Sequence, residues 1–271
     1  MEWITHGDVN TRFFFAKAKQ RKLSTYIYNI NDDQGNQVEG FEKAGNIMMQ
    51  FYKKLMGKQP ALRSSLSKEV IAQGQVLSAE QQVQMCQKFT DKDIRDAIFS
   101  IPNTKSPGPD GFSSGFFKTT WSKIGPMICS AIQSFFLIGS LPRFISEAKL
   151  IILPKVDHPQ SATEFRPISY CNVLYKCISK LLCQRIKTVL SHIIHQSQGA
   201  FVRGRELLYN VLICHDIVRG YQRKHISPRY ILKMDLQKAF DSNHWEFVKE
   251  MLEFLKFLAV DLESTQPQEG G

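Results

Sequence analysis

The spacing of apolar residues along the chain predicts a series of amphipathic helices. Apolar positions that recur every three or four residues predict helices near 41–55, 94–101, 174–194 and 207–221. Thr90 and Asp93 form a capping-box sequence before the second of these, and Pro126 is expected in the first turn of another helix. A final helix is expected after Asn243 and Glu246, which form a second capping-box sequence.

Strand patterns are fewer. Thr25–Ile30 alternates between polar and apolar residues and leads into a turn sequence at 31–36, which predicts the tip of a hairpin. Ala148–Leu153 is a short apolar run that ends at Pro154 and predicts a buried strand, and Tyr230–Leu236 predicts another strand. A helix-rich chain with few strands is typical of the α+β or α/β classes.

The distribution of charged residues along the chain says more about function than the overall composition does. The chain has 271 residues and a formal net charge of +10, and 43% apolar residues are enough for a hydrophobic core. Residues 141–225 carry 13 basic and 5 acidic side chains, whereas residues 226–271 carry 5 basic and 8 acidic ones. A basic surface beside clustered carboxylates suits a site that processes a polyanion, and a solvated basic face is the open alternative.

Cysteines and targeting patterns bear on the compartment. The six cysteines contain no C-x-x-C pair, so we expect reduced thiols rather than a zinc site or a disulfide framework. The longest apolar runs, such as Leu150–Leu153, are too short to span a bilayer, and residues 1–10 do not resemble a signal peptide. We therefore expect an intracellular protein of the nucleus or cytoplasm, without a membrane partner and not secreted.

The clearest chemical signal is Asp235 at the end of the strand predicted over 230–236. A carboxylate in this position, together with the carbonyl of Leu236, offers the hard oxygen ligands that Mg²⁺ prefers beside substrate phosphates. Phe240, five residues further on, could pack beneath a sugar bound next to that metal. An aspartate that only caps a turn is the alternative interpretation.

Several short blocks occur in one order along the chain. They are Trp3–Asp8, Asn10–Phe14, Ser106–Gly111, Ile152–Lys155, Phe165–Ser169, Asn172–Lys176, Gln198–Val202, Gly204–Arg205 and Asp235–Asp241. In this order the blocks resemble the reverse transcriptase of LINE-type (non-LTR) retrotransposons, particularly those of plants. The resemblance runs from about Trp3 to Phe257.

The resemblance implies an α+β fold that is a partial right-hand polymerase, with fingers and an incomplete palm. It suggests a linker region before the polymerase at 1–89, fingers and partial palm at 90–258, and an unstructured tail at 259–271. It also implies an RNA template, a DNA primer and deoxynucleoside triphosphates as partners, with Mg²⁺ as cofactor. The implied activity is nucleotidyl transfer assisted by two metal ions.

Individual residues take roles from the same resemblance. Lys155 and Arg166 would face the triphosphate of the incoming nucleotide, for which the planar guanidinium of arginine is well suited. Asp235 matches the catalytic carboxylate that binds metal, with the Leu236 carbonyl as a second metal ligand. Phe240 matches the aromatic residue that excludes a ribose 2′-hydroxyl.

Gln198 and Arg205 complete the set of nucleotide-binding residues that the resemblance implies. They belong, with Phe201 and Gly204, to a block that borders the template and the nucleotide pocket in that family.

One part of the family pattern is missing from the sequence. A second carboxylate motif, Tyr/Phe-Ala-Asp-Asp, follows the Asp235 block in the family and does not occur here. Two-metal phosphoryl transfer requires carboxylates from two strands. We therefore expect an amino-terminal fragment that is inactive alone, and a nucleic-acid-binding remnant without catalysis is the alternative.

Overall fold

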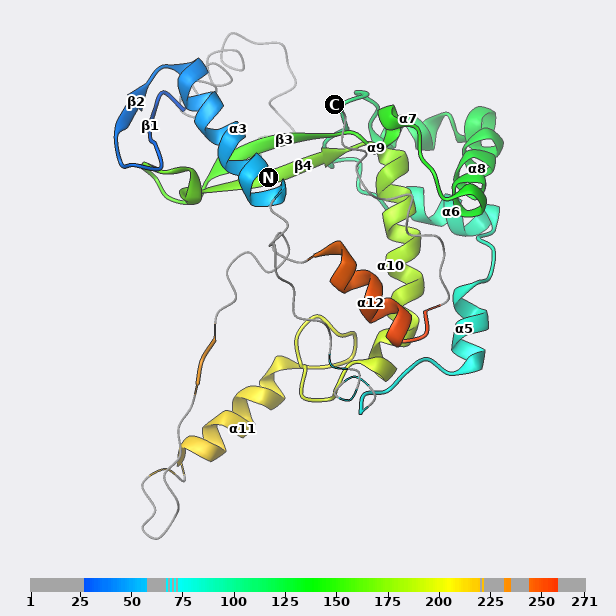
Figure 1. Ribbon diagram of the computed structural model, residues 1–271. Helices are drawn as coiled ribbons and strands as arrows, with labels where there is room; N and C mark the ends of the chain where they lie inside the picture. Colours follow the sequence, from blue (N-terminus) through cyan, green and yellow to red (C-terminus); the bar gives the residue numbers. More distant parts are fainter. Residues whose placement is uncertain are drawn as a thin grey trace. The chain divides into compact units, whose positions relative to one another are not determined.

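The computed structural model describes residues 27–57, 67, 69, 71, 73–219, 221, 232–234 and 244–257. The chain forms two compact units (Figure 1). The first comprises residues 1–60 and 150–169, and the second comprises residues 61–149 and 170–271. None of the helices described is long and apolar enough to cross a membrane.

The first unit begins with a small antiparallel hairpin. Strands β1 (Asn29–Asn31) and β2 (Gln37–Glu39) pair with Ile30 opposite Val38. In the turn, the carboxylate of Asp32 accepts hydrogen bonds of 2.9 Å from the backbone N–H groups of Gln34 and Asn36. These bonds satisfy turn donors that the hairpin ladder cannot reach, so the predicted hairpin tip is confirmed.

Helix α3 (Phe41–Gly57) supplies one side of the core of this unit, as its periodicity predicted. Ala44, Met48 and Tyr52 recur at helical spacing on its buried face. They pack in a cluster with Ile30 and Phe165.

Strands β3 (Ala148–Pro154) and β4 (Phe165–Cys171) form a second two-stranded sheet, and the helical turn η1 (Ala162–Glu164) lies between them. The expectation of a buried strand at 148–153 is wrong, because most of β3 is exposed. Only Ile152 of this run packs against the buried cluster of the first unit.

The core of the second unit is helical. It lies among α6 (Asp91–Phe99), α8 (Trp121–Ile138) and α10 (Val173–Ile193), with Phe117 from the short helix α7 (Ser114–Thr119). Ile94, Ile98 and Leu181 are almost fully buried there. The capping box predicted for α6 is present: Thr90 Oγ1 accepts from the Asp93 N–H, and the Asp93 carboxylate accepts from the Thr90 N–H.

Helix α8 differs from its prediction at the N-terminus. It begins at Trp121, so Pro126 lies inside the helix instead of in its first turn. A proline at 126 removes the hydrogen bond to the carbonyl of Ser122, which is an exposed residue of the first turn where water can replace that bond. The helix ends as expected at Gly139, whose φ of +79° is a left-handed cap.

Two sequence blocks that lie far apart in the chain are joined in this unit. The buried side-chain amide of Asn172 accepts a 3.3 Å bond from the Asp110 N–H and donates a 2.7 Å bond to the Phe144 carbonyl. Lys176 Nζ donates to the Ser106 carbonyl at 2.7 Å. The start of α10 therefore fixes the turn at 106–111, with Gly108 packed directly against Asn172.

Two further helices were not placed correctly in every detail. Helix α5 (Ala79–Met85), capped by Ser78, was not predicted from the spacing of apolar residues. Helix α12 (Trp245–Phe254) is present, but its N-cap is His244, without a side-chain capping bond, instead of Asn243. The short helix α9 is Arg143–Ser146.

Helix α11 (Leu207–Arg219) was predicted from its apolar residues, yet none of its residues is buried. Residues 232–234 of the strand expected at 230–236 are not in a strand, and the rest of that segment lies outside the described residues. The fold is α+β and rich in helix, as predicted. The division at residues 89 and 258 stays a prediction.

Candidate functional site

Lys155 lies at the tip of the β3–β4 hairpin in the first unit. Its backbone N–H donates to the Glu164 carbonyl at 2.8 Å, and its Nζ donates to the Thr163 carbonyl at 2.6 Å. The Glu164 carboxylate in turn accepts a 2.6 Å bond from the Gln160 N–H. The ammonium group thus caps the turn that it begins, while remaining exposed to solvent.

Arg166 is the second residue of β4 and belongs to the same end of this hairpin. Strand alternation explains its position, because Phe165 points into the core and Arg166 then points away from it. Within the described part of the chain, the exposed guanidinium of Arg166 has no hydrogen bond or ion pair. The structure therefore brings Lys155 and Arg166 to one hairpin tip, and only Arg166 has all its donors available.

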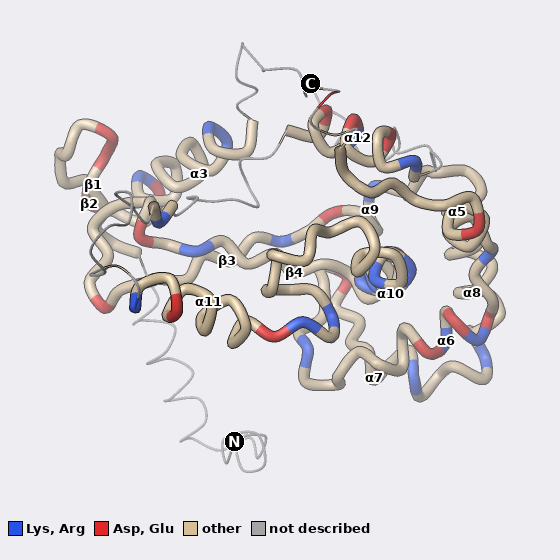
Figure 2. Tube along the Cα trace, turned by 90° about the horizontal axis from the view of Figure 1, so that it is seen from below, with Lys and Arg blue, Asp and Glu red and all other residues tan. Residues whose placement is uncertain are grey.

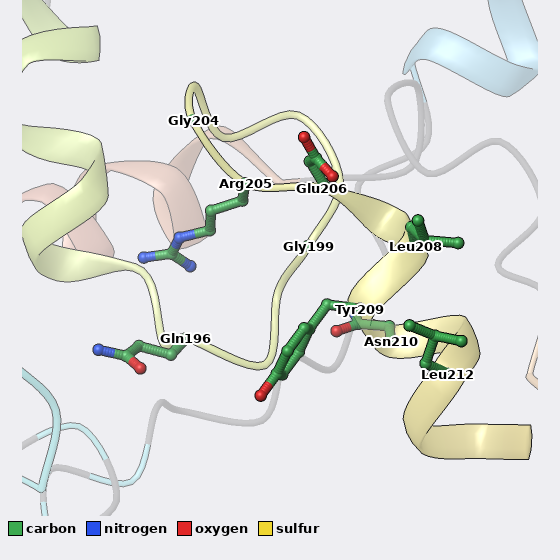
Figure 3. Close-up of a pocket in the computed structure, with 9 residues that line it drawn as sticks. All are labelled: Gln196, Gly199, Gly204, Arg205, Glu206, Leu208, Tyr209, Asn210 and Leu212. Carbon is green, nitrogen blue, oxygen red and sulfur yellow. The ribbon is translucent and has the colours of Figure 1, made fainter. Parts of the chain in front are cut away.

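Arg205 lies in the second unit, in the loop of residues 194–206 between α10 and α11 (Figure 3). Its guanidinium donates to four carbonyls, those of Ser191 (3.0 Å), Ile194 (2.8 Å), His195 (2.7 Å) and Gln198 (3.1 Å). Carbonyls at the end of a helix have no partner within the helix, and a cation there also opposes the negative end of its dipole. Arg205 is therefore the C-terminal cap of α10.

Gln198 is held by the same loop. Its carbonyl accepts from Arg205, and its Nε2 donates to the Ala200 carbonyl at 3.2 Å. A cavity of about 360 Å³ lies beside this loop and is lined by Arg205, Tyr209 and neighbouring residues (Figure 3). The nucleotide-binding roles expected for Gln198 and Arg205 stay predictions.

Phe201 has an unusual backbone in the same loop. Its φ is +64°, and 97% of the surface of the residue is exposed. The left-handed region costs a bulky residue about 1–2 kcal/mol, so the surrounding loop must hold this conformation in place.

Helix α10 gives the second unit a basic surface. It contains Lys176, Lys180, Arg185 and Lys187 but no acidic residue, so the charged positions that Figure 2 colours on this helix are all basic. Arg185 is used inside the unit: its guanidinium lies 3.4 Å from the centre of the Phe89 ring and donates to the Met85 carbonyl at 3.0 Å. Burial lowers the pKa of this guanidinium, which the nearby Asp93 carboxylate opposes.

The metal-binding part of the predicted site is not described. Asp235, Leu236 and Phe240 lie outside the described residues. Among the residues that the structure describes, no group of three or more His, Cys, Asp or Glu side chains could hold a metal ion. The roles of these three residues stay predictions.

Sequence reasoning missed the structural use of several charged and polar groups. It did not foresee that Asn172 and Lys176 hold the Gly108 turn, or that Arg205 caps α10. An asparagine directly before a long helical pattern was the available signal for Asn172. Nothing in the local spacing indicated four carbonyl partners for Arg205.

A family model described as reverse transcriptase (RNA-dependent DNA polymerase) matches residues 153–264. The matched region includes Lys155, Arg166, Gln198, Arg205 and Asp235. This segment is therefore a reverse transcriptase domain of the kind found in retrotransposon Pol proteins.

Curated relatives come from transposable elements of animals. The chain is 27% identical over 257 residues to the transposon TX1 uncharacterized 149 kDa protein of Xenopus laevis, covering 95% of this chain and 20% of that protein. It is 30% identical over 196 residues to the Retrovirus-related Pol polyprotein from type-2 retrotransposable element R2DM of Drosophila melanogaster, covering 72% of this chain and 17% of that protein.

A third relative is the Retrovirus-related Pol polyprotein from type-1 retrotransposable element R2 of Nasonia vitripennis, 27% identical over 135 residues, which cover 50% of this chain and 12% of that protein. The chain thus spans a fifth or less of the length of these three relatives. The matches confirm the resemblance to non-LTR retrotransposon reverse transcriptases. The plant-like character of the sequence stays a prediction.

Proposed function

We propose that this chain is part of an RNA-directed DNA polymerase and binds an RNA template paired with a DNA primer. The observation that carries the proposal is the reverse transcriptase match over residues 153–264, which contains the predicted site residues. The acid-free surface of α10 supports it, because phosphates are attracted by lysines that carry no competing carboxylates. Lys180 and Lys187 have no side-chain hydrogen bond among the residues that the structure describes.

For the nucleotide, we propose that Arg166 contacts the triphosphate and that Lys155 assists from the same hairpin tip. The available guanidinium of Arg166 supports this role, since a planar fork can bind two phosphate oxygens at once. A quantitative test is the binding of a deoxynucleoside triphosphate to the chain with its primer and template. Arg166→Gln should weaken this binding about tenfold, whereas Arg143→Gln, which removes an exposed arginine paired with Glu147, should not change it.

We propose Mg²⁺ as the metal, held by the Asp235 carboxylate and the Leu236 carbonyl. This donor set suits a hard divalent cation that also takes phosphate oxygens as ligands. A metal ion bound there would neutralise negative charge on the phosphates at the reaction centre. The six free cysteines are compatible with a reducing, intracellular location in the nucleus or cytoplasm, which we also propose.

We also propose that the chain of 271 residues does not catalyse DNA synthesis by itself. One carboxylate block cannot position two divalent ions, and the sequence contains no Tyr/Phe-Ala-Asp-Asp motif that would supply the second. The second candidate function is therefore nucleic-acid binding without catalysis, which the excess of basic residues at 141–225 favours.

Fluorescence anisotropy with a labelled RNA–DNA primer–template tests the binding that both candidates share. The affinity should fall steeply as the salt concentration rises, because bound phosphates release counterions. Lys180→Gln combined with Lys187→Gln should reduce the slope of log affinity against log salt by about 1–2 units. Affinity that does not change with salt would contradict the proposal.

A further inference from the structure

The loop of residues 194–206 holds one aromatic ring out into solvent. Phe201 is 97% exposed, while its neighbour Val202 is buried at 6% and anchors the loop. The φ of +64° at Phe201 is a conformation that bulky residues rarely adopt. An apolar side chain that is both exposed and held in a strained backbone conformation is more often retained for a contact than for stability.

The backbone on each side of Phe201 is fixed. Before it, Arg205 holds the Gln198 carbonyl, and the Asn210 side-chain amide donates to the Ser197 carbonyl at 2.9 Å. After it, the Arg205 N–H donates to the Val202 carbonyl at 3.2 Å. The ring is therefore presented by a braced loop, which lowers the entropy lost when something binds to it.

The two arginines of this loop differ in what they contact. The guanidinium of Arg205 is committed to four carbonyls. Arg203 is exposed, and the described part of the chain offers its side chain no hydrogen bond or ion pair. The loop thus carries one ring and, two residues away, one guanidinium that is free to bind an external group, with Glu206 as its single acidic residue.

We propose that Phe201 is a stacking platform for an unpaired base of single-stranded nucleic acid, with Arg203 bound to an adjacent phosphate. A nucleotide offers a flat π-face next to a negative charge, and these two side chains match both parts. The excess of basic residues over 141–225 favours this occupant over an uncharged partner. The inference rests on the proposed function, because it names a surface for the same nucleic acid.

The test compares binding of the full chain to a short labelled RNA single strand and to a duplex of the same length. Phe201→Leu should weaken single-strand binding about tenfold, which corresponds to about 1.4 kcal/mol. Duplex binding should stay unchanged, because paired bases cannot stack on the ring. Phe201→Trp should retain single-strand binding, and the bound base should quench the fluorescence of the new indole.

The chain supplies a matched control for each change. Phe144→Leu alters another phenylalanine that is 70% exposed, and it should leave both affinities as in the wild type. Arg203→Gln should reduce the salt slope for the single strand by about 0.7, the value for one lost phosphate contact. Arg205→Gln should lower the melting temperature instead, because that side chain caps α10.

The outcomes separate this inference from the proposed function. If the wild type binds RNA in a salt-dependent manner and Phe201→Leu binds the single strand equally well, the stacking platform is wrong and the proposed function stands. If the wild type binds neither single strand nor duplex nor primer–template, the proposed function and this inference are both wrong. If Phe201→Leu leaves RNA binding intact but abolishes self-association in sedimentation, the ring contacts protein and the inference is also wrong.

Discussion

Gly108 is the position where a single added methyl group should do the most damage. A Cβ at residue 108 would lie 2.2 Å from Asn172 Oδ1 and 2.5 Å from the Asn172 Cα and backbone N, where ordinary contacts begin near 3.4 Å. Its φ is not left-handed, so the effect of Gly108→Ala is steric. Because two of the three atoms are backbone at the start of α10, the clash cannot be relieved by turning a side chain.

The magnitude follows from what must move. Overpacking of this kind costs about 1–3 kcal/mol, and displacing Asn172 also weakens its bonds to Asp110 and Phe144, at about 1 kcal/mol each. We expect Gly108→Ala to lower the free energy of unfolding by about 4 kcal/mol. For a unit of this size the melting temperature should fall by about 10 °C.

Thermal unfolding followed by circular dichroism measures this shift, with Gly115→Ala as the control. Gly115 lies in α7, where the nearest atom to a new Cβ is 3.5 Å away and alanine is the better helix former, so this variant should be as stable as the wild type or more stable. Gly108→Ala combined with Asn172→Ala should not recover stability, because the backbone atoms of residue 172 remain. A melting temperature for Gly108→Ala within about 1 °C of the wild type would refute this reasoning.

Three further predictions concern the second unit. Arg205→Gln should free the loop at 194–206 and lower the free energy of unfolding by about 1–2 kcal/mol. Amide hydrogen exchange in the loop should become faster, and unchanged exchange would contradict the capping role. Hydrogen bonds from the Thr90 side chain and backbone lower the pKa of Asp93. The Asp93 carboxylate therefore stabilises the fold above its ordinary pKa, and this contribution disappears as the pH falls through the lowered pKa. Denaturant unfolding should show that Asp93→Asn costs about 0.5 kcal/mol at neutral pH and little in acid. Burial raises the pKa of the Cys177 thiol to about 12. Iodoacetamide at neutral pH should therefore modify the exposed Cys183 before Cys177, as followed by mass spectrometry. The reverse order of modification would contradict the burial of Cys177.

Periodicity predicted most helices because each buries one apolar face in a local pattern of three to four residues. The helices at 41–57, 91–99 and 173–193 are of this kind. The sequence prediction failed at α8, where Pro126 was expected in the first turn but lies inside the helix. The cost of an interior proline depends on whether water reaches the freed carbonyl, which the sequence does not show. The prediction also failed for β3, since an apolar run does not reveal how many strands will cover it.

The site was predictable to a lesser degree, because its contacts join residues that are distant in sequence. The sequence could place Arg205 in a family block, but four carbonyl partners at the end of α10 are a property of the folded loop. In the same way, the sequence suggested that Lys155 faces a triphosphate but did not reveal that its ammonium group donates to the Thr163 carbonyl. Arg166 has an exposed guanidinium without a hydrogen bond or ion pair to any residue that the structure describes, and its nucleotide-binding role stays a prediction.

The measurement that tests the central claim most directly is primer extension by the folded 271-residue chain on an RNA template, with Asp235→Asn assayed in parallel. The reactions contain Mg²⁺, and Mn²⁺ replaces it in a second series. Our account predicts that the wild type binds the primer–template in a salt-dependent manner but incorporates no more nucleotide than Asp235→Asn. Incorporation by the wild type that disappears in Asp235→Asn would show that the chain supplies the missing carboxylates elsewhere, and it would contradict the account.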